Sequence, residues 1–232
     1  MNYDWNFGAL LHYWELWGRG VIATISLSLP VIAVGTIFGI GLVIGRKSRF
    51  SFLRFLCRVY VDLFRAIPAL VLMGTLYFCL PIFTGFRITP FQTAFIALTL
   101  NLAPFAAECI RSGIESISTV QYDSAYVVGF TGWKRVRYII GPQAIRRVIP
   151  PLLGECITTL KLTSLAATIG VPEIWNATGQ IVTATSLPLE SRIIGASLYV
   201  LIILPLLWLF SLLERRFKVK GLGDTTGTYM ER

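Results

Sequence analysis

Residues that commonly carry out catalysis or bind metals are few in this sequence and lie far apart. The only histidine is His12, and Cys57, Cys79, Cys109 and Cys156 are spaced too widely to form a CxxC pair. A zinc site or a disulfide framework finds no support, and the cysteines are expected to pack as small apolar residues. The sequence also lacks a G-x-x-x-x-G-K-[ST] loop, a G-x-S-x-G elbow and an H-E-x-x-H motif. We therefore expect neither a cofactor site nor enzyme activity on this chain.

The chemistry that remains lies in charged side chains beside apolar runs. Arg54, Arg58, Asp62 and Arg65 recur at i, i+4, i+8 and i+11, which places them on one face of a helix. Such a helix can lie in the membrane interface or form the inner half of a long span, and Arg54 and Arg58 can be snorkelling charges. Arg65 lies deepest and is followed by Pro68, which frees backbone carbonyls. Freed polar groups at that depth face a cavity, so Arg65 is the better functional candidate.

The composition explains why a membrane must be considered. The chain has 232 residues, of which 55% are hydrophobic and 14% charged, and its mean hydropathy is +0.68. These values exclude an ordinary soluble globular protein and a disordered chain. The net charge of +9 fits a nucleic-acid binder, but uncharged runs of about twenty residues fit membrane helices instead.

The apolar runs predict an all-α, polytopic membrane helix bundle that forms one domain over residues 1–232. Each run is long enough to cross about 30 Å of hydrocarbon. The five expected spans are 20–45, 55–80, 88–107, 148–171 and 193–213. In the first span, Gly35 with Gly39 and Gly41 with Gly45 form two small-xxx-small pairs, which let another helix approach closely.

The distribution of Lys and Arg predicts the orientation of these spans. Five spans place the segments between them alternately on the two sides of the membrane. Of the 21 Lys and Arg residues, 18 fall on one side and 3 on the other. Because basic residues concentrate in cytoplasmic loops, the N-terminus is expected outside and the C-terminus in the cytoplasm. The start lacks a basic segment and a cleavage site, which favours a retained helix over a signal peptide. Trp5, Trp14 and Trp17 fit an interfacial segment on the outer face.

The longest polar stretch is the expected cytoplasmic loop at 108–147. Ser118 and Gln121 have the spacing of a capping box, so a short helix should begin there. Gly129 can end it in the left-handed conformation, a second short helix is expected at 133–140, and Gly141-Pro142 should break it. Apolar and aromatic residues among the charges indicate a docking surface, and the alternative is an ordinary solvated loop.

A membrane protein without catalytic residues or an energy source of its own is a channel, a secondary carrier or part of a larger machine. A secondary carrier often has two repeated halves and needs ion-coupling carboxylates in its spans. Neither a repeat nor such a set of carboxylates is found in this sequence. A membrane-anchored enzyme lacks the residues that it would need.

Several segments, in the same order along the chain, resemble one family. The loop sequence QYDSAYVVGF at 121–130, followed by IGPQAIRR at 140–147, resembles the EAA loop of binding-protein-dependent ABC importer permeases. FRAIPAL at 64–70, LKLTSLA at 160–166 and IGVPE at 169–173 are similar to segments of the polar amino-acid uptake family. The resemblance covers roughly residues 18–218.

The resemblance implies a type I ABC importer permease fold in the bacterial inner membrane and a set of partners. These partners are two cytoplasmic ATPase subunits that hold ATP and Mg, a second permease that is identical or a sister, and an extracytoplasmic solute-binding protein. The short helix in the loop would be the coupling helix, seated in a groove of the ATPase. Its implied coupling residues are Gln121, Asp123, Ser124, Ala125 and Gly129.

The implied solute is a polar amino acid, and four residues are candidates for its path. A zwitterion needs a cation for its carboxylate and acceptors for its ammonium in a cavity with little water. The candidates are Arg65, Glu108, Thr163 and Ser164. For each of them, an interhelical hydrogen bond or a snorkelling charge is an alternative role. Leu162 stands where many relatives carry Asp, which favours a neutral or acidic amino acid over a basic one. A stand-alone secondary amino-acid carrier or channel is the alternative function.

Overall fold

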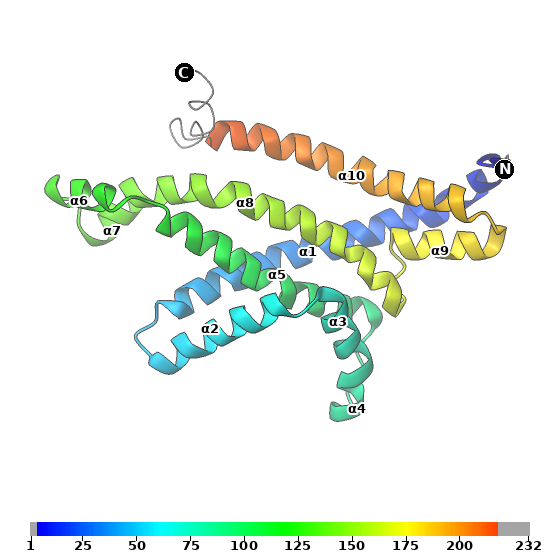
Figure 1. Cartoon of the computed structure of the whole chain (residues 1–232), viewed down its shortest axis with the longest axis horizontal. Helices are drawn as coiled ribbons and strands as arrows, with labels where there is room; N and C mark the ends of the chain where they lie inside the picture. The colour runs from blue at the N-terminus through cyan, green and yellow to red at the C-terminus, as the bar shows by residue number, and fades with distance from the viewer. Residues whose placement is uncertain (1–3, 218–232) are drawn as a thin grey trace, which may run out of the picture.

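Long helices dominate the fold. The structure is a computed structural model that describes the backbone of residues 4–217 and the side chains of residues 4–212, and within this part every regular element is a helix. Four helical segments are long and apolar enough to cross a membrane, and a bent pair of helices adds a fifth. The four contain α1 (Trp14–Arg46), α5 (Pro90–Glu115), α8 (Gly141–Leu162) and α10 (Pro188–Phe217), drawn in Figure 1. The predicted all-α membrane bundle is confirmed, and these helices begin or end several residues away from the predicted boundaries.

The second expected span, 55–80, is a bent pair of helices. α2 (Ser51–Ala66) and the segment Ala69–Thr84 meet at an angle of 104°. Pro68 has no amide to donate, and the residue before it, Ile67, is extended with φ −86° and ψ 123°. Beyond this break, α3 (Ala69–Gly74), a π-helical turn and α4 (Leu80–Thr84) lead away from α2, as Figure 1 shows.

Glycines on α1 allow it to lie directly against α5. A Cβ atom on Gly39 would lie 2.8 Å from the backbone oxygen of Ala103, and one on Gly35 would lie 2.9 Å from the side chain of Leu102. Both contacts are closer than a real Cβ tolerates, so the predicted close approach at this pair is confirmed. Gly41 of the second pair has open space around it and makes no such contact.

The end of the bundle near the N-terminus is fixed by a buried carboxylate. Glu173 is fully buried and caps α9 (Ile174–Thr185), accepting hydrogen bonds from the amides of Trp175 at 2.8 Å and Asn176 at 2.7 Å. It also accepts a hydrogen bond from the Tyr199 hydroxyl on α10. Trp17, expected at the interface, instead packs inside with only 6% exposure, because its indole lies among apolar residues of α9 and donates to Thr178.

The polar loop is shorter than the predicted 108–147, because α5 continues to Glu115 and α8 begins at Gly141. Between them lie α6 (Thr119–Val127), α7 (Gly132–Arg135) and a π-helical turn, Val136–Ile140. The predicted break at Gly141-Pro142 is wrong. The wider π turn accommodates the missing amide of Pro142, and the helix continues without interruption. In Figure 1, α6 and α7 lie at the opposite end of the bundle from the N-terminus.

Candidate functional site

A cavity of about 440 Å³ lies where the break after α2 faces α5 and α8. Its polar lining includes Arg65 from α2, Asn101 from α5, and Glu155, Thr158 and Thr159 from α8. The last three residues have i, i+3 and i+4 spacing and therefore share one face of the helix. The cavity brings a cation and a carboxylate together in a largely apolar bundle, which suits a solute that carries both charges.

Glu155 is the charged residue of this cavity that the sequence-based candidates omitted, together with the polar residues Asn101, Thr158 and Thr159. It is half-buried, and it makes no hydrogen bond or ion pair to any residue in the described part of the chain. A carboxylate in a membrane helix is costly unless it meets a cation, water or a ligand. The signal in the sequence was Glu155 itself, a charge inside an apolar run, with Thr158 and Thr159 on the same helix face.

Arg65 lies at the edge of the cavity, as expected from its position before Pro68. Its side chain is 44% exposed, and its guanidinium carbon lies 5.7 Å from the centre of the Phe105 ring, which also lines the cavity. A guanidinium over an aromatic face keeps a favourable contact while its N–H groups remain able to donate. Arg65 is therefore placed to bind an anionic group in the cavity.

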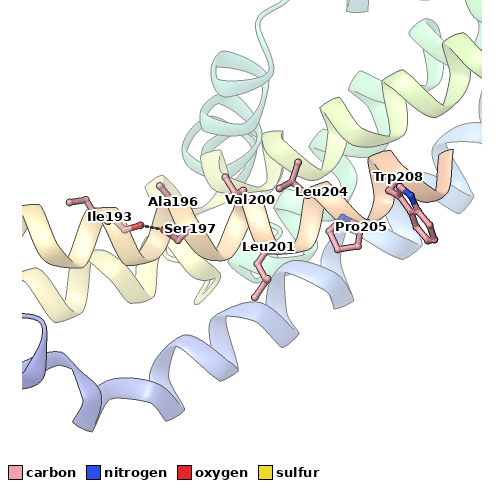
Figure 2. Close-up of a pocket in the computed structure, with 8 residues that line it drawn as sticks. All are labelled: Ile193, Ala196, Ser197, Val200, Leu201, Leu204, Pro205 and Trp208. Atoms are coloured by element: carbon pink, nitrogen blue, oxygen red, sulfur yellow. Dashed lines mark hydrogen bonds between the residues drawn. The ribbon is translucent and has the colours of Figure 1, made fainter. Parts of the chain in front are cut away.

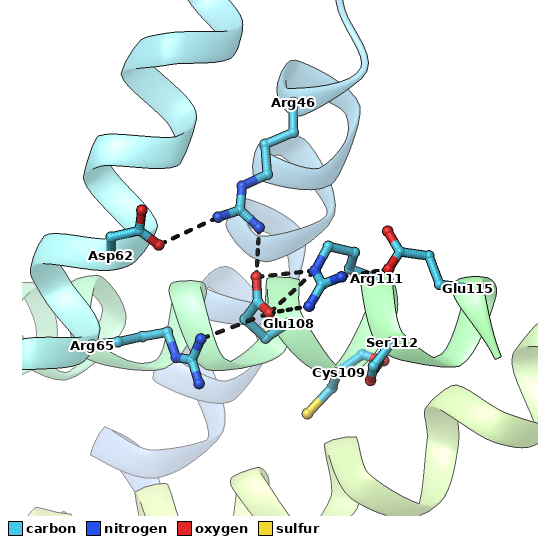
Figure 3. Close-up of polar contacts among 8 residues, drawn as sticks. All are labelled: Arg46, Asp62, Arg65, Glu108, Cys109, Arg111, Ser112 and Glu115. Carbon is cyan, nitrogen blue, oxygen red and sulfur yellow. Dashed lines mark hydrogen bonds and ion pairs between the residues drawn. The ribbon is translucent and has the colours of Figure 1, made fainter.

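Glu108 lies outside the cavity lining, at the centre of an ion-pair cluster (Figure 3). Its Oε1 lies 2.5 Å from Arg46 on α1, and its Oε2 lies 2.7 Å from Arg111 on α5. Arg65 is a third and looser partner, 3.7 Å from Oε2. The structure thus brings the predicted residues Arg65 and Glu108 together, but with Glu108 surrounded by cations.

The cluster links α1, α2 and α5. It lies near the ends of α1 and α5 that the distribution of Lys and Arg predicts to be cytoplasmic. Arg46 also lies 3.7 Å from Asp62 on α2, and Arg111 also pairs with Glu115. The hollow around these charges has a volume of about 400 Å³. Because each carboxylate meets at least one guanidinium, the cluster stabilises the contact of α1, α2 and α5.

Thr163 and Ser164 do not line the Arg65 cavity. Thr163 is fully buried and donates its hydroxyl to the Leu160 carbonyl at 2.7 Å. Ser164 donates to the Lys161 carbonyl at 2.8 Å and lines a separate groove of about 620 Å³ against α10. Both residues belong to the short 3-10 helix Thr163–Ile169 that follows α8, and neither is part of the cavity lining that holds Glu155.

The expected coupling residues lie on and just after α6. Gln121, Asp123 and Ser124 are exposed, whereas Ala125 is only 1% exposed and packs against the chain itself. Ser118 caps the helix by accepting from the Val120 amide at 3.3 Å, so the predicted N-cap is confirmed. The predicted capping box with Gln121 is wrong, because the Gln121 amide donates to the Ser118 carbonyl and the Gln121 side chain accepts from Gln143 instead.

Gly129 ends α6 as expected, with φ +84° in the left-handed region. The Phe130 amide donates to the Ala125 carbonyl at 2.8 Å, and the Gly129 amide donates to the Tyr126 carbonyl at 2.9 Å. These two bonds form a Schellman motif. The motif leaves Tyr126, Val127 and Val128 exposed by 68%, 84% and 72%.

An apolar hollow of about 720 Å³ runs along the outer face of α10 (Figure 2). It lies between Ile193 and Trp208, and its one lining hydroxyl, on Ser197, donates to the Ile193 carbonyl at 2.8 Å. A surface of this kind fits lipid or an apolar helix and offers no partner for a charged solute. The described residues also contain no group of three His, Cys, Asp or Glu side chains that could hold a metal ion.

Comparison with known proteins supports the resemblance over most of the chain. The family model of the binding-protein-dependent transport system inner membrane component matches residues 37–219. The glutamine transport system permease protein GlnP of Escherichia coli (strain K12) is 31% identical over 94% of this chain and 100% of its own. The arginine transport system permease protein ArtQ of Bacillus subtilis (strain 168) is 30% identical over 86% of this chain and 91% of its own.

A solved structure shares the fold. The crystal structure of an amino acid ABC transporter with histidines has 29% sequence identity and a TM-score of 0.87 over 92% of this chain and 100% of that chain. The chain belongs to the family of binding-protein-dependent transport system inner membrane components and is a permease subunit of a bacterial ABC transporter.

Proposed function

We propose that the chain forms half of the path for an amino acid, with Arg65 binding the carboxylate of the solute and Glu155 its ammonium group. The observation that carries this proposal is the cavity that both side chains line, in which Glu155 makes no hydrogen bond or ion pair to a described residue and feels only the charge of Arg65. A zwitterion that enters would supply a counter-charge to each of them. Charged groups are removed from water at acceptable cost only when they are paired in this way.

The cavity also favours a class of side chain. Leu162 and Phe105 form apolar parts of its wall, and Glu155 is its one carboxylate. Once Glu155 binds the α-ammonium group, no further carboxylate of the lining remains for a second cation. A neutral or acidic amino acid is therefore favoured over a basic one. The names of the similar proteins include both a glutamine and an arginine permease, so a transport assay must compare the two solutes.

The energy for uptake comes, in this proposal, from ATP and Mg bound to a pair of ATPase subunits in the cytoplasm. The exposed residues Tyr126, Val127 and Val128 give α6 an apolar surface for docking in a groove of the ATPase. A partner that contacts α6 differently in its open and closed states would shift the permease between outward and inward conformations. A solute-binding protein delivers the amino acid outside, and an identical or sister permease completes the path.

The proposed orientation has the N-terminus outside and the C-terminus in the cytoplasm. It rests on the excess of Lys and Arg in the α1–α2 turn and in the loop that holds α6. The basic residues from Lys218 onward, which contribute to that count, lie outside the described residues.

The test uses the complex of permease, ATPase and binding protein in proteoliposomes. We expect Arg65→Gln and Glu155→Gln each to reduce ATP-driven uptake of labelled L-glutamine at least about tenfold, because each leaves one charge of the solute unpaired. Glu115→Gln is the matched control, since Glu115 carries the same charge but lies outside the cavity lining. Wild-type uptake by both cavity variants, or a stronger preference for L-arginine in the wild-type complex, would contradict the proposal.

A further inference from the structure

Arg65 is the one residue that lines both the cavity with Glu155 and the charged hollow around Glu108. Its guanidinium is thus within reach of two kinds of partner, Glu108 on one side and an anionic group in the cavity on the other. Figure 3 shows Arg65 approaching Glu108 from α2, whereas Arg46 and Arg111 approach from α1 and α5.

The three arginines do not hold Glu108 equally. The contacts of Arg46 and Arg111 are 2.5 and 2.7 Å, whereas that of Arg65 is 3.7 Å. The Glu108 side chain is 18% exposed and that of Arg65 is 44% exposed. Both carboxylate oxygens therefore have short, charge-assisted bonds without Arg65, and the longer, more exposed contact is the weakest of the three.

From this arrangement we infer that Glu108 is a positioning residue that competes with the carboxylate of the solute for Arg65. The inference rests on the proposed function, in which Arg65 binds that carboxylate. A bound solute replaces Glu108 as the partner of Arg65 at little cost, because Arg46 and Arg111 continue to neutralise Glu108. When the solute leaves, Arg65 pairs with Glu108 again. The competition therefore lowers the affinity of the cavity for the solute and favours its release.

The exchange also has a mechanical consequence. Arg65 lies on α2 and Glu108 on α5, so their contact is one of the ionic links between these helices. A solute that withdraws Arg65 removes that link and leaves the Arg46–Asp62 contact, at 3.7 Å, to join α2 to the cluster. Binding in the cavity is thereby connected to the packing of the helices that surround it.

The experiment measures binding of labelled L-glutamine to the purified permease–ATPase complex without the binding protein. Glu108→Gln removes the competing charge, and we expect the dissociation constant to fall about threefold, as for the loss of a half-exposed ion pair. Glu115→Gln removes the same charge from a residue whose ion pair, within the described part of the chain, is with Arg111 and not with Arg65, and it should leave the constant unchanged. An unchanged or weaker affinity in Glu108→Gln, or an equal gain in Glu115→Gln, overturns the inference.

A double-mutant cycle shows whether Glu108 acts through Arg65. In the Arg65→Gln background, Glu108→Gln should have no further effect on binding, and a persisting gain would contradict the inference. If the complex with Glu108→Gln does not assemble, Glu108→Asp is used instead. Its shorter side chain keeps the carboxylate closer to α5 and farther from Arg65, so a smaller gain in solute affinity is expected. If Arg65→Gln alone leaves L-glutamine binding unchanged, the proposed function fails. If that variant weakens binding but Glu108→Gln changes nothing, only the present inference fails.

Discussion

Replacement of Gly129 by alanine isolates the backbone conformation at the end of the coupling helix. Gly129 has φ +84°, and a Cβ atom added there would meet no other atom within 4 Å. The substitution therefore adds no steric contact with neighbouring residues, and its cost arises from holding an L-residue in the left-handed region. That cost is about 1–2 kcal/mol, or a factor of about 5–30 in the ratio of the formed turn to its disrupted states.

The loss of this turn should reduce coupling and leave the membrane part intact. The Schellman bonds from Gly129 and Phe130 fix where α6 ends and α7 begins. In proteoliposomes that contain the ATPase and the binding protein, we expect Gly129→Ala to lower L-glutamine uptake and solute-stimulated ATP hydrolysis together. Both should fall by up to about 5- to 30-fold. The melting temperature of the detergent-purified permease, which reports on unfolding of the membrane helices, should change little.

The matched control is Gly129→Asn, because asparagine adopts the left-handed conformation more readily than alanine. We expect this variant to retain most of the uptake and most of the stimulated hydrolysis. Full coupling in Gly129→Ala would refute the reasoning. Equal losses in the alanine and asparagine variants would also refute it, because the backbone conformation would then not be the cause.

Two further predictions concern stability. Gly39→Ala should lower the melting temperature of the purified permease by an amount that corresponds to about 1–3 kcal/mol, because its Cβ would overlap the backbone of α5. Gly41→Ala is the control and should melt like the wild type, since that position is open. Glu173→Ala should destabilise more than Glu173→Gln, because alanine removes both the cap of α9 and the acceptor of the Tyr199 hydroxyl. The lost cap alone is worth about 0.5–2 kcal/mol, and equal melting of these two variants would contradict this role.

Features that depend on local sequence could be predicted. Long apolar runs identify the spans because a helix must satisfy its own backbone in lipid. The left-handed turn at Gly129 followed from a glycine after a capped helix, and the close packing of Gly35 and Gly39 followed from their spacing. The position of Arg65 just before Pro68 predicted that Arg65 would face a cavity.

Features that depend on contacts between distant segments could not be predicted. The angle at Pro68 is set by the packing of α3 beyond it, and the π turn before Pro142 replaces a break that the sequence favours. Glu108 was expected in the solute path, but three arginines, two of them from other helices, surround it. Glu155 was overlooked because the cavity that it lines is completed by residues of α2 and α5, which are distant in sequence.

The central claim is that this chain is a passive half of a pore that a separate ATPase drives. The most direct test measures accumulation of labelled L-glutamine in proteoliposomes, with the permease alone and with the permease, ATPase and binding protein together. We predict accumulation against a gradient only in the complete system with ATP and Mg, and its loss when ATP is replaced by a non-hydrolysable analogue. Accumulation by the permease alone, without nucleotide, would contradict the account.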